Sequence, residues 1–161
     1  MDKPFYLLAI LLMFVFCWLI QEENQLWDQQ RQLLKSANNK ATHDALYAAS
    51  ELNSGHVRID PVTASNLYIQ SLQLNLGLDH MMQPKSGSPV YSGVRIVHFE
   101  IIDDFSGRSF PFIYENSSFN ITKFLRGPAV VGVIEVDTPS IFRGSHSRVR
   151  VPAIYEYARA S

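Results

Sequence analysis

The sequence contains very little cysteine. Cys17 is the only cysteine among 161 residues, and it lies within an apolar run. A single cysteine excludes an intrachain disulfide and any zinc site built from several cysteines. A domain outside the cell without disulfides must be stabilised by packing alone, which is more usual for bacterial surface proteins than for small secreted animal modules.

The sequence also lacks an excess of charge of either sign. Its formal net charge is −1, with 14 Lys and Arg against 15 Asp and Glu. This balance is unlike the strongly basic composition of nucleic-acid-binding domains and unlike that of acidic disordered chains. We therefore expect no nucleic acid among the partners.

Common catalytic motifs are missing as well. The sequence has no G-x-S-x-G, P-loop, G-x-G-x-x-G or H-E-x-x-H motif. Asp103 and Asp104 offer carboxylates to a calcium ion, but an Asp-rich hairpin turn is the simpler interpretation. We predict that the chain is not an enzyme and uses no catalytic residue, metal or cofactor. The five histidines, which form no close ligand pair, are His43, His56, His80, His98 and His146.

Charge and glycine are both absent from residues 4–20, PFYLLAILLMFVFCWLI. As a helix this run is about 25 Å long, the short end of what spans a bilayer. Backbone amides in lipid must be satisfied internally, so an inserted run must be helical. We predict a transmembrane anchor in residues 1–20, in contact with membrane lipid. Its apolar side chains are Phe5, Leu7, Leu8, Ile10, Leu11, Leu12, Phe14, Val15, Phe16, Trp18, Leu19 and Ile20.

Two alternatives to this anchor remain, a cleaved signal peptide and a helix buried in a soluble domain. A signal peptide would need a basic start and an Ala-x-Ala cleavage site. Here only Met1, Asp2 and Lys3 precede the run, and no Ala-x-Ala follows it. Lys3 before the run and Glu22 after it favour a single-pass orientation in the cell membrane, with a cytoplasmic N-terminus and an extracellular C-terminal domain.

Glycine and proline are absent from residues 21–52, which are rich in strong helix formers. We predict an amphipathic helical extension over residues 21–53, continuous with the anchor and ended by Gly55 in a left-handed cap. Helical spacing places one apolar packing stripe on it. The stripe consists of Leu26, Leu33, Ala37, Ala41, Ala45, Ala48 and Leu52.

The remaining residues, 54–161, are predicted to form an extracellular α+β head domain. Asp60 and Pro61 are typical of a helix start, and Gly77 of its end, which predicts a short second helix. Alternating and β-branched segments then predict an antiparallel meander of about five strands, with 129–136 in the centre. In the last strand, Arg148 and Arg150 are expected to face water. The predicted strands cover residues 94–102, 109–114, 119–125, 129–136 and 148–157.

Three stretches carry a resemblance to a known family. They are AxxxAxHDAxxAA at residues 37–49, GHVRIDP at 55–61 and LQLNLGLD at 72–79. With the long apolar helix and the strand-rich end, the chain resembles type IV pilin-like proteins, nearest to the TadE/TadG-like pseudopilins of the tight-adherence type. The resemblance implies membrane insertion followed by assembly into, or priming of, a surface pilus. Its implied partners are other pilin-like single-pass subunits or further copies of this chain.

One part of the family pattern is absent. Pilin precursors resembling this chain carry a small residue at their cleavage site and Glu early in the apolar run, whereas no acidic residue lies between Lys3 and Gln21. A processed filament subunit and an uncleaved accessory subunit both remain open. Two other functions also remain, an anchored binding or sensor module with a pocket lined by Tyr and Phe from the strands, and an ectoenzyme with a nucleophile beside a base.

Overall fold

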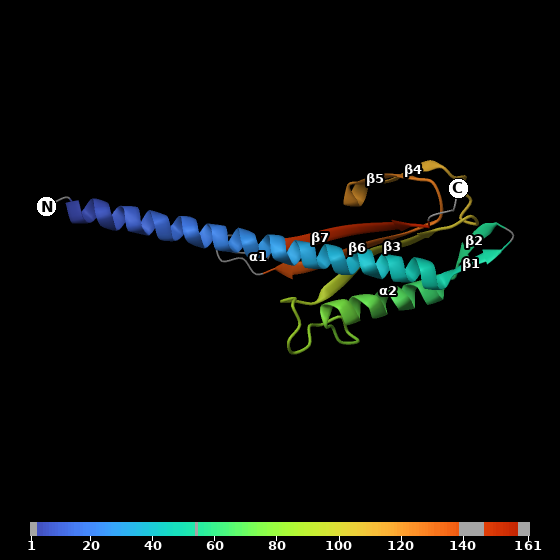
Figure 1. The fold of residues 1–161 in the computed structure, drawn as a ribbon, viewed down its shortest axis with the longest axis horizontal. Coiled ribbons are helices and arrows are strands. Elements are labelled where there is room, and N and C mark those ends of the chain that lie inside the picture. Colours follow the sequence, from blue (N-terminus) through green and yellow to red (C-terminus); the bar gives the residue numbers. More distant parts are fainter. Residues whose placement is uncertain (1–2, 54, 139–146, 158–161) are drawn as a thin grey trace.

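The computed structural model describes residues 3–53, 55–138 and 147–157 (Figure 1). The expected α+β fold class is confirmed, with a long first helix, a short second helix and antiparallel strands. In chain order the elements are α1 (Lys3–Ala49), β1 (Ser50–Asn53), β2 (His56–Ile59), α2 (Pro61–Leu76), β3 (Val94–Ile102), β4 (Phe112–Asn116), the 3₁₀ turn η1 (Ser117–Phe119), β5 (Ile121–Leu125), β6 (Ala129–Thr138) and β7 (Ser147–Glu156).

The helix α1 is one uninterrupted element of 47 residues, about 70 Å long at 1.5 Å per residue. Its first half projects from the head as a bare rod, and its second half packs with α2 and the sheet (Figure 1). It ends at Ala49, so the expected helical end at residue 53 is wrong. Residues 50–53 pair as β1 with β2 instead, in a register that joins Ser50 to Ile59. Gly55, with φ +84°, lies between these two strands and does not cap α1.

The helix α2 has the expected boundaries because its end signals are local. The Thr63 amide donates to Asp60 Oδ2 at 2.8 Å, and Pro61 occupies the first turn, where a missing amide costs nothing. Gly77 ends the helix with φ +62° and donates its amide to the Gln73 carbonyl. Val57 and Ile59 of β2 are buried just before it.

Three strands form the main sheet in the order β3-β6-β7, with both pairs antiparallel. The expected central position of residues 129–136 is confirmed, because β6 pairs on both edges. The expected simple meander is not observed: among the described strands, β4 and β5 pair only with each other, and β3 pairs with β6. The reason lies in β6, whose residues 129–136 are all buried, so both faces of the sheet must be covered.

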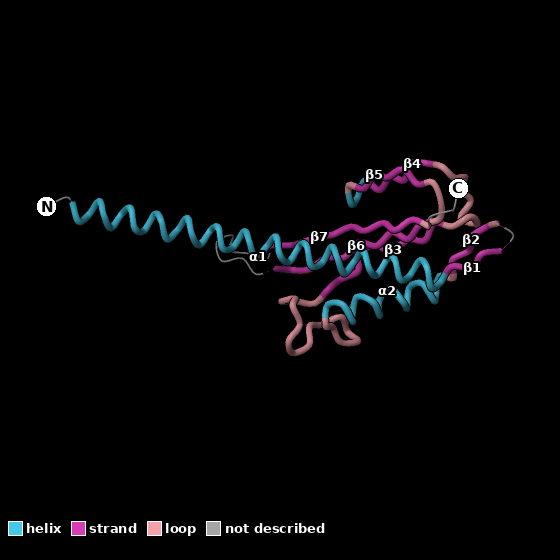
Figure 2. The backbone as a smooth tube through the Cα atoms, viewed as in Figure 1, coloured by secondary structure: helices cyan, strands magenta, loops and turns pink. Residues whose placement is uncertain are grey.

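The two faces of the sheet have different covers. Val130, Ile134 and Val136 pack in the core that α1 and α2 complete. Ala129, Val131 and Val133 pack in a second core with residues of the β4–β5 hairpin. Figure 2 shows the hairpin on the side of the sheet opposite α2, and the β1–β2 hairpin at the end of the head far from the N-terminus. The head therefore has three layers.

Candidate functional site

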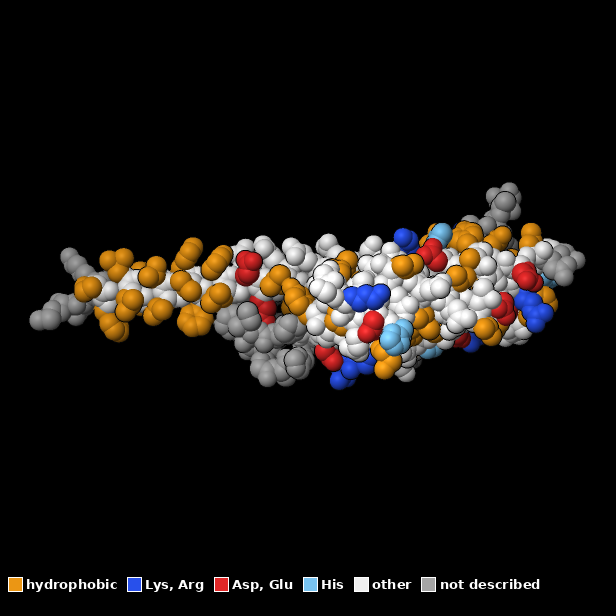
Figure 3. All heavy atoms as spheres, turned by 90° about the horizontal axis from the view of Figure 1, so that it is seen from below, with side chains coloured by type: hydrophobic (Ala, Val, Ile, Leu, Met, Phe, Trp, Pro, Cys, Tyr) orange, Lys and Arg blue, Asp and Glu red, His pale blue; other side chains and the backbone are white. Residues whose placement is uncertain are grey.

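The most unusual surface of the molecule is the N-terminal half of α1. Eleven of the twelve predicted anchor side chains are between 40% and 74% exposed, and Leu19 is half-buried. No residue in the most apolar part of α1 is buried within the described structure. Figure 3 shows this concentration of apolar side chains along the rod, with charged side chains gathered on the head.

This surface is far larger than the apolar patches that soluble monomers expose to water. The helical backbone satisfies its own hydrogen bonds, so only the side chains require an apolar environment. Among the described residues, α1 is the one helix long and apolar enough to span a membrane. A helix buried within its own domain, one of the sequence alternatives, is excluded for this segment because its side chains are exposed.

The predicted packing stripe of α1 is only partly buried. Ala37, Ala41 and Ala45 are at most 4% exposed, and Leu33 is half-buried. Leu26, Ala48 and Leu52 are exposed, so their predicted packing role is wrong. The buried face is wider than one stripe because α1 contacts both α2 and the sheet. Its other buried members are Gln30, Leu34, Asn38, Thr42, Leu46 and Ala49.

Asn38 is the functional-site residue that the sequence did not reveal. Its side chain is fully buried, and its amide nitrogen donates to the Gly132 carbonyl at 3.0 Å and to the Val151 carbonyl at 2.8 Å. Its Oδ1 accepts a 2.6 Å hydrogen bond from the Tyr68 hydroxyl of α2. Burial raises the pKa of Tyr68, which keeps this hydroxyl a donor. One side chain thus ties α1 to α2, β6 and β7.

Gly132 completes this junction. A Cβ at this position would overlap the Tyr68 ring, whose Cε2 and Cζ atoms would lie 2.8 Å away. Tyr68 is only 1% exposed, so its ring has little room to move. Glycine is needed here because α2 presses an aromatic ring directly against the backbone of β6.

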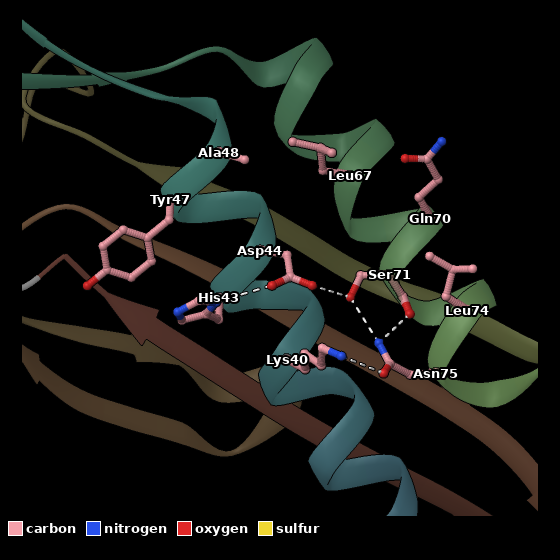
Figure 4. Close-up of a pocket in the computed structure, with 10 residues that line it drawn as sticks. All are labelled: Lys40, His43, Asp44, Tyr47, Ala48, Leu67, Gln70, Ser71, Leu74 and Asn75. Carbon is pink, nitrogen blue, oxygen red and sulfur yellow. Dashed lines mark hydrogen bonds and ion pairs between the residues drawn. The ribbon is translucent and has the colours of Figure 1, made fainter.

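A groove of about 360 Å³ lies between α1 and α2 (Figure 4). Its polar groups bond to one another: Lys40 Nζ donates to Asn75 Oδ1 at 3.1 Å, and Ser71 Oγ donates to Asp44 Oδ2 at 2.7 Å. Burial alone would raise the pKa of Asp44, but the hydrogen bond from Ser71 and the neighbouring His43 outweigh it and lower this pKa. These contacts join the two helices. The groove is lined by helices and not by strands, so it is not the pocket expected of a binding module.

The charged residues of β7 are neutralised within the sheet. Arg148 and Arg150 are exposed, as expected, and Val149 and Val151 are buried. Arg150 Nη2 lies 2.8 Å from Glu135 Oε2, and Arg148 and Arg95 also approach this carboxylate. Burial would raise the pKa of Glu135, yet the hydrogen bond from Arg150 and the nearby positive charges hold it below its usual range.

A second polar cluster attaches the β4–β5 hairpin to β3. The Tyr114 hydroxyl donates to Glu100 Oε2 at 2.6 Å. His98 Nε2 lies 3.2 Å from the Tyr114 hydroxyl oxygen and 3.2 Å from Glu100 Oε2. Burial and the Glu100 carboxylate raise the pKa of Tyr114 to about 12. The Phe119 ring stacks on His98 with centroids 5.2 Å apart. The cluster holds the second layer against the sheet.

The two candidate calcium ligands bind the backbone. Asp104 Oδ2 accepts the Val57 amide at 2.6 Å, and Asp103 Oδ2 accepts the Ile59 amide at 3.2 Å. Asp103 also accepts the Phe105 amide, as in an Asp-rich turn. Within the described ranges, no three Asp, Glu, His or Cys side chains gather as metal ligands. His146 and the N-terminal residues Met1 and Asp2 lie outside these ranges.

Comparisons with known proteins add nothing to this geometry: no protein-family model, curated protein or solved structure matches the chain.

Proposed function

We propose that this chain is a membrane-anchored, pilin-like structural or assembly subunit of a cell-surface pilus or secretion apparatus. One observation carries the proposal. A single continuous helix has an exposed apolar first half and a second half that packs one face against the head. An apolar rod fixed in this way to a folded head is what a chain needs if its helices pack side by side in lipid or in a filament core.

The attachment of the rod to the head supports a mechanical role. The junction is made by Asn38, by the buried alanines beside it and by the Lys40–Asn75 and Asp44–Ser71 bonds. Beyond Pro4 in its first turn, α1 contains no proline or glycine, the residues at which helices most often kink. A load on the anchor would therefore pass to the sheet without a hinge.

The proposed orientation places the N-terminus in the cytoplasm and the head outside the cell. Lys3 precedes the apolar segment, and Glu22 and Glu23 follow it. Short basic flanks tend to remain in the cytoplasm. The proposed partners are membrane lipid and other single-pass pilin-like subunits or copies of this chain.

Membrane insertion can be tested by washing membranes that contain the full-length chain with alkaline carbonate. The proposal expects the chain to stay in the pellet, and its release at full length would overturn the anchor. Mass spectrometry of the mature N-terminus distinguishes an uncleaved accessory subunit from a processed filament subunit. An intact Met1 indicates the accessory subunit, and a shortened chain indicates pilin-type processing.

Assembly can be tested with the single native cysteine. Cys17 lies within the exposed apolar segment, so an oxidant should link two chains there if their helices pack side by side through the face that carries Cys17. In a Cys17→Ala background, cysteines placed one at a time along residues 10–16 should cross-link with helical periodicity. Uniformly absent cross-links, together with a strictly monomeric protein in mild detergent, would refute self-assembly. Cys17→Ala without a new cysteine is the control.

A further inference from the structure

A second groove lies between α1 and β7, at the end of the head nearest the apolar rod. It has a volume of about 430 Å³. Its α1 side carries charged and polar side chains, and its β7 side includes Arg150 and Pro152. The residues that line it are Asp28, Arg31, Gln32, Lys35, Arg150, Val151 and Pro152.

Three cations and the carboxylate of Asp28 line the groove. Because Glu135 neutralises Arg150, the excess positive charge comes from Arg31 and Lys35. Arg31 and Lys35 are exposed, and no hydrogen bond or ion pair joins either of them to another side chain in the described part of the chain. They stand four positions apart on one helical face, where like charges repel each other. An anion between them would remove this repulsion. Arg150 is held in place by Glu135, 2.8 Å away.

The position of the groove along α1 suggests the source of the anion. The apolar run of about 25 Å is shorter than the roughly 30 Å hydrocarbon core of a bilayer, so insertion draws the first polar turns towards the membrane surface. Arg31 follows Ile20 by eleven residues, about 16 Å along the axis. Helical side chains lean towards the N-terminus of the helix, which brings the guanidinium of Arg31 back towards the layer of lipid headgroups.

We propose that this groove binds the phosphate of an anionic phospholipid headgroup, with Arg31 and Lys35 as its main contacts. Guanidinium groups bind phosphate oxygens through paired, charge-assisted hydrogen bonds. The inference rests on the membrane insertion of the proposed function and not on subunit assembly or on which side the head occupies. Such a contact would fix the depth and rotation of the anchor at the membrane surface.

The test uses the full-length chain in mild detergent with equal amounts of phosphatidylglycerol and phosphatidylcholine. Native mass spectrometry then measures the ratio of the two bound lipids. In the double variant Arg31→Gln/Lys35→Gln, the preference for phosphatidylglycerol should fall about fivefold for each charge that is removed. The reason is that one cation near an anionic surface contributes an attraction of about this size. The matched control, Arg58→Gln/Arg126→Gln, removes two exposed cations outside the groove and should leave the ratio within about twofold, because screening confines the effect to about 10 Å.

Three outcomes would overturn the lipid site. They are an unchanged ratio in the groove variant, an equal fall in the control variant, and displacement of phosphatidylglycerol by millimolar inorganic phosphate, which would indicate a general anion site. Carbonate washing of the same variants keeps the two proposals apart. Retention in the membrane with a lost lipid preference supports the lipid site, whereas release of the unmodified chain would overturn the proposed anchor itself.

Discussion

Replacing Asn38 by alanine should loosen the junction between rod and head. The substitution removes the 3.0 and 2.8 Å hydrogen bonds to the Gly132 and Val151 carbonyls and the 2.6 Å bond from Tyr68. Each bond contributes about 1 kcal/mol net, and a buried hydroxyl left without an acceptor costs a further 1–3 kcal/mol or so. Alanine regains about 0.6 kcal/mol in helix propensity. We expect a loss of about 3–5 kcal/mol from the free energy of unfolding.

The measurement is urea unfolding of the full-length chain in mild detergent, followed by near-ultraviolet circular dichroism of the head. Asn39→Ala is the matched control, because Asn39 is the next residue on the same helix and is exposed. It should change stability by no more than about 0.6 kcal/mol, in the stabilising direction. Tyr68→Phe alone should cost about 1 kcal/mol.

A double-mutant cycle between Asn38→Ala and Tyr68→Phe isolates the bond between them. Its coupling energy should exceed about 0.5 kcal/mol, since residues in one hydrogen-bond network are not additive. If Asn38→Ala and its Asn39→Ala control unfold at the same urea concentration, the buried amide does not hold the helix to the sheet. The argument for a rigid mechanical link would then fail.

Four further predictions concern the core, the pH response and the anchor. Gly132→Ala should lower stability by about 1–3 kcal/mol through overpacking against Tyr68, whose hydroxyl would be the atom nearest to the new Cβ. Tyr68→Phe should therefore cost less in this background than in the unmodified chain, in the same urea assay. Because the pKa of Tyr114 is raised from 10.0 to about 12, the stability it contributes is present below pH 10 and lost as the pH rises through 12. An absorbance titration of tyrosinate should show this high-pH component, which disappears in Tyr114→Phe. The pKa of Glu135 is lowered, so the pH dependence of its contribution to stability is the reverse: the contribution is present above pH 4.5 and is lost in acid. Glu135→Gln should therefore make stability fall less steeply as the pH is lowered. Leu12→Lys places a charge in the centre of the apolar segment at a cost of about 3 kcal/mol, and should reduce the fraction retained after a carbonate wash; undiminished retention would argue against insertion.

The parts of this fold that are set by neighbouring residues in the chain were predictable from the sequence. The boundaries of α2 follow from Asp60, Pro61 and Gly77, all within one turn of the ends that they set. The central place of β6 follows from a run of β-branched residues too apolar for an edge. The end of α1 was predicted wrongly because residues 50–53 have no strong local preference, and pairing with β2 decided their conformation.

The composition of residues 4–20 by itself determined that the chain carries one apolar helix, because hydrophobicity is a property of the residues and needs no partner. Only the tertiary structure decided that Asn38 is buried and Asn39 exposed, since the carbonyls that Asn38 meets lie 94 and 113 positions away in the sequence. It also decided that the hairpin of β4 and β5 leaves the sheet to cover the second face of β6. Local patterns limit what each segment can become, and the free energy of burying these segments together selects one arrangement.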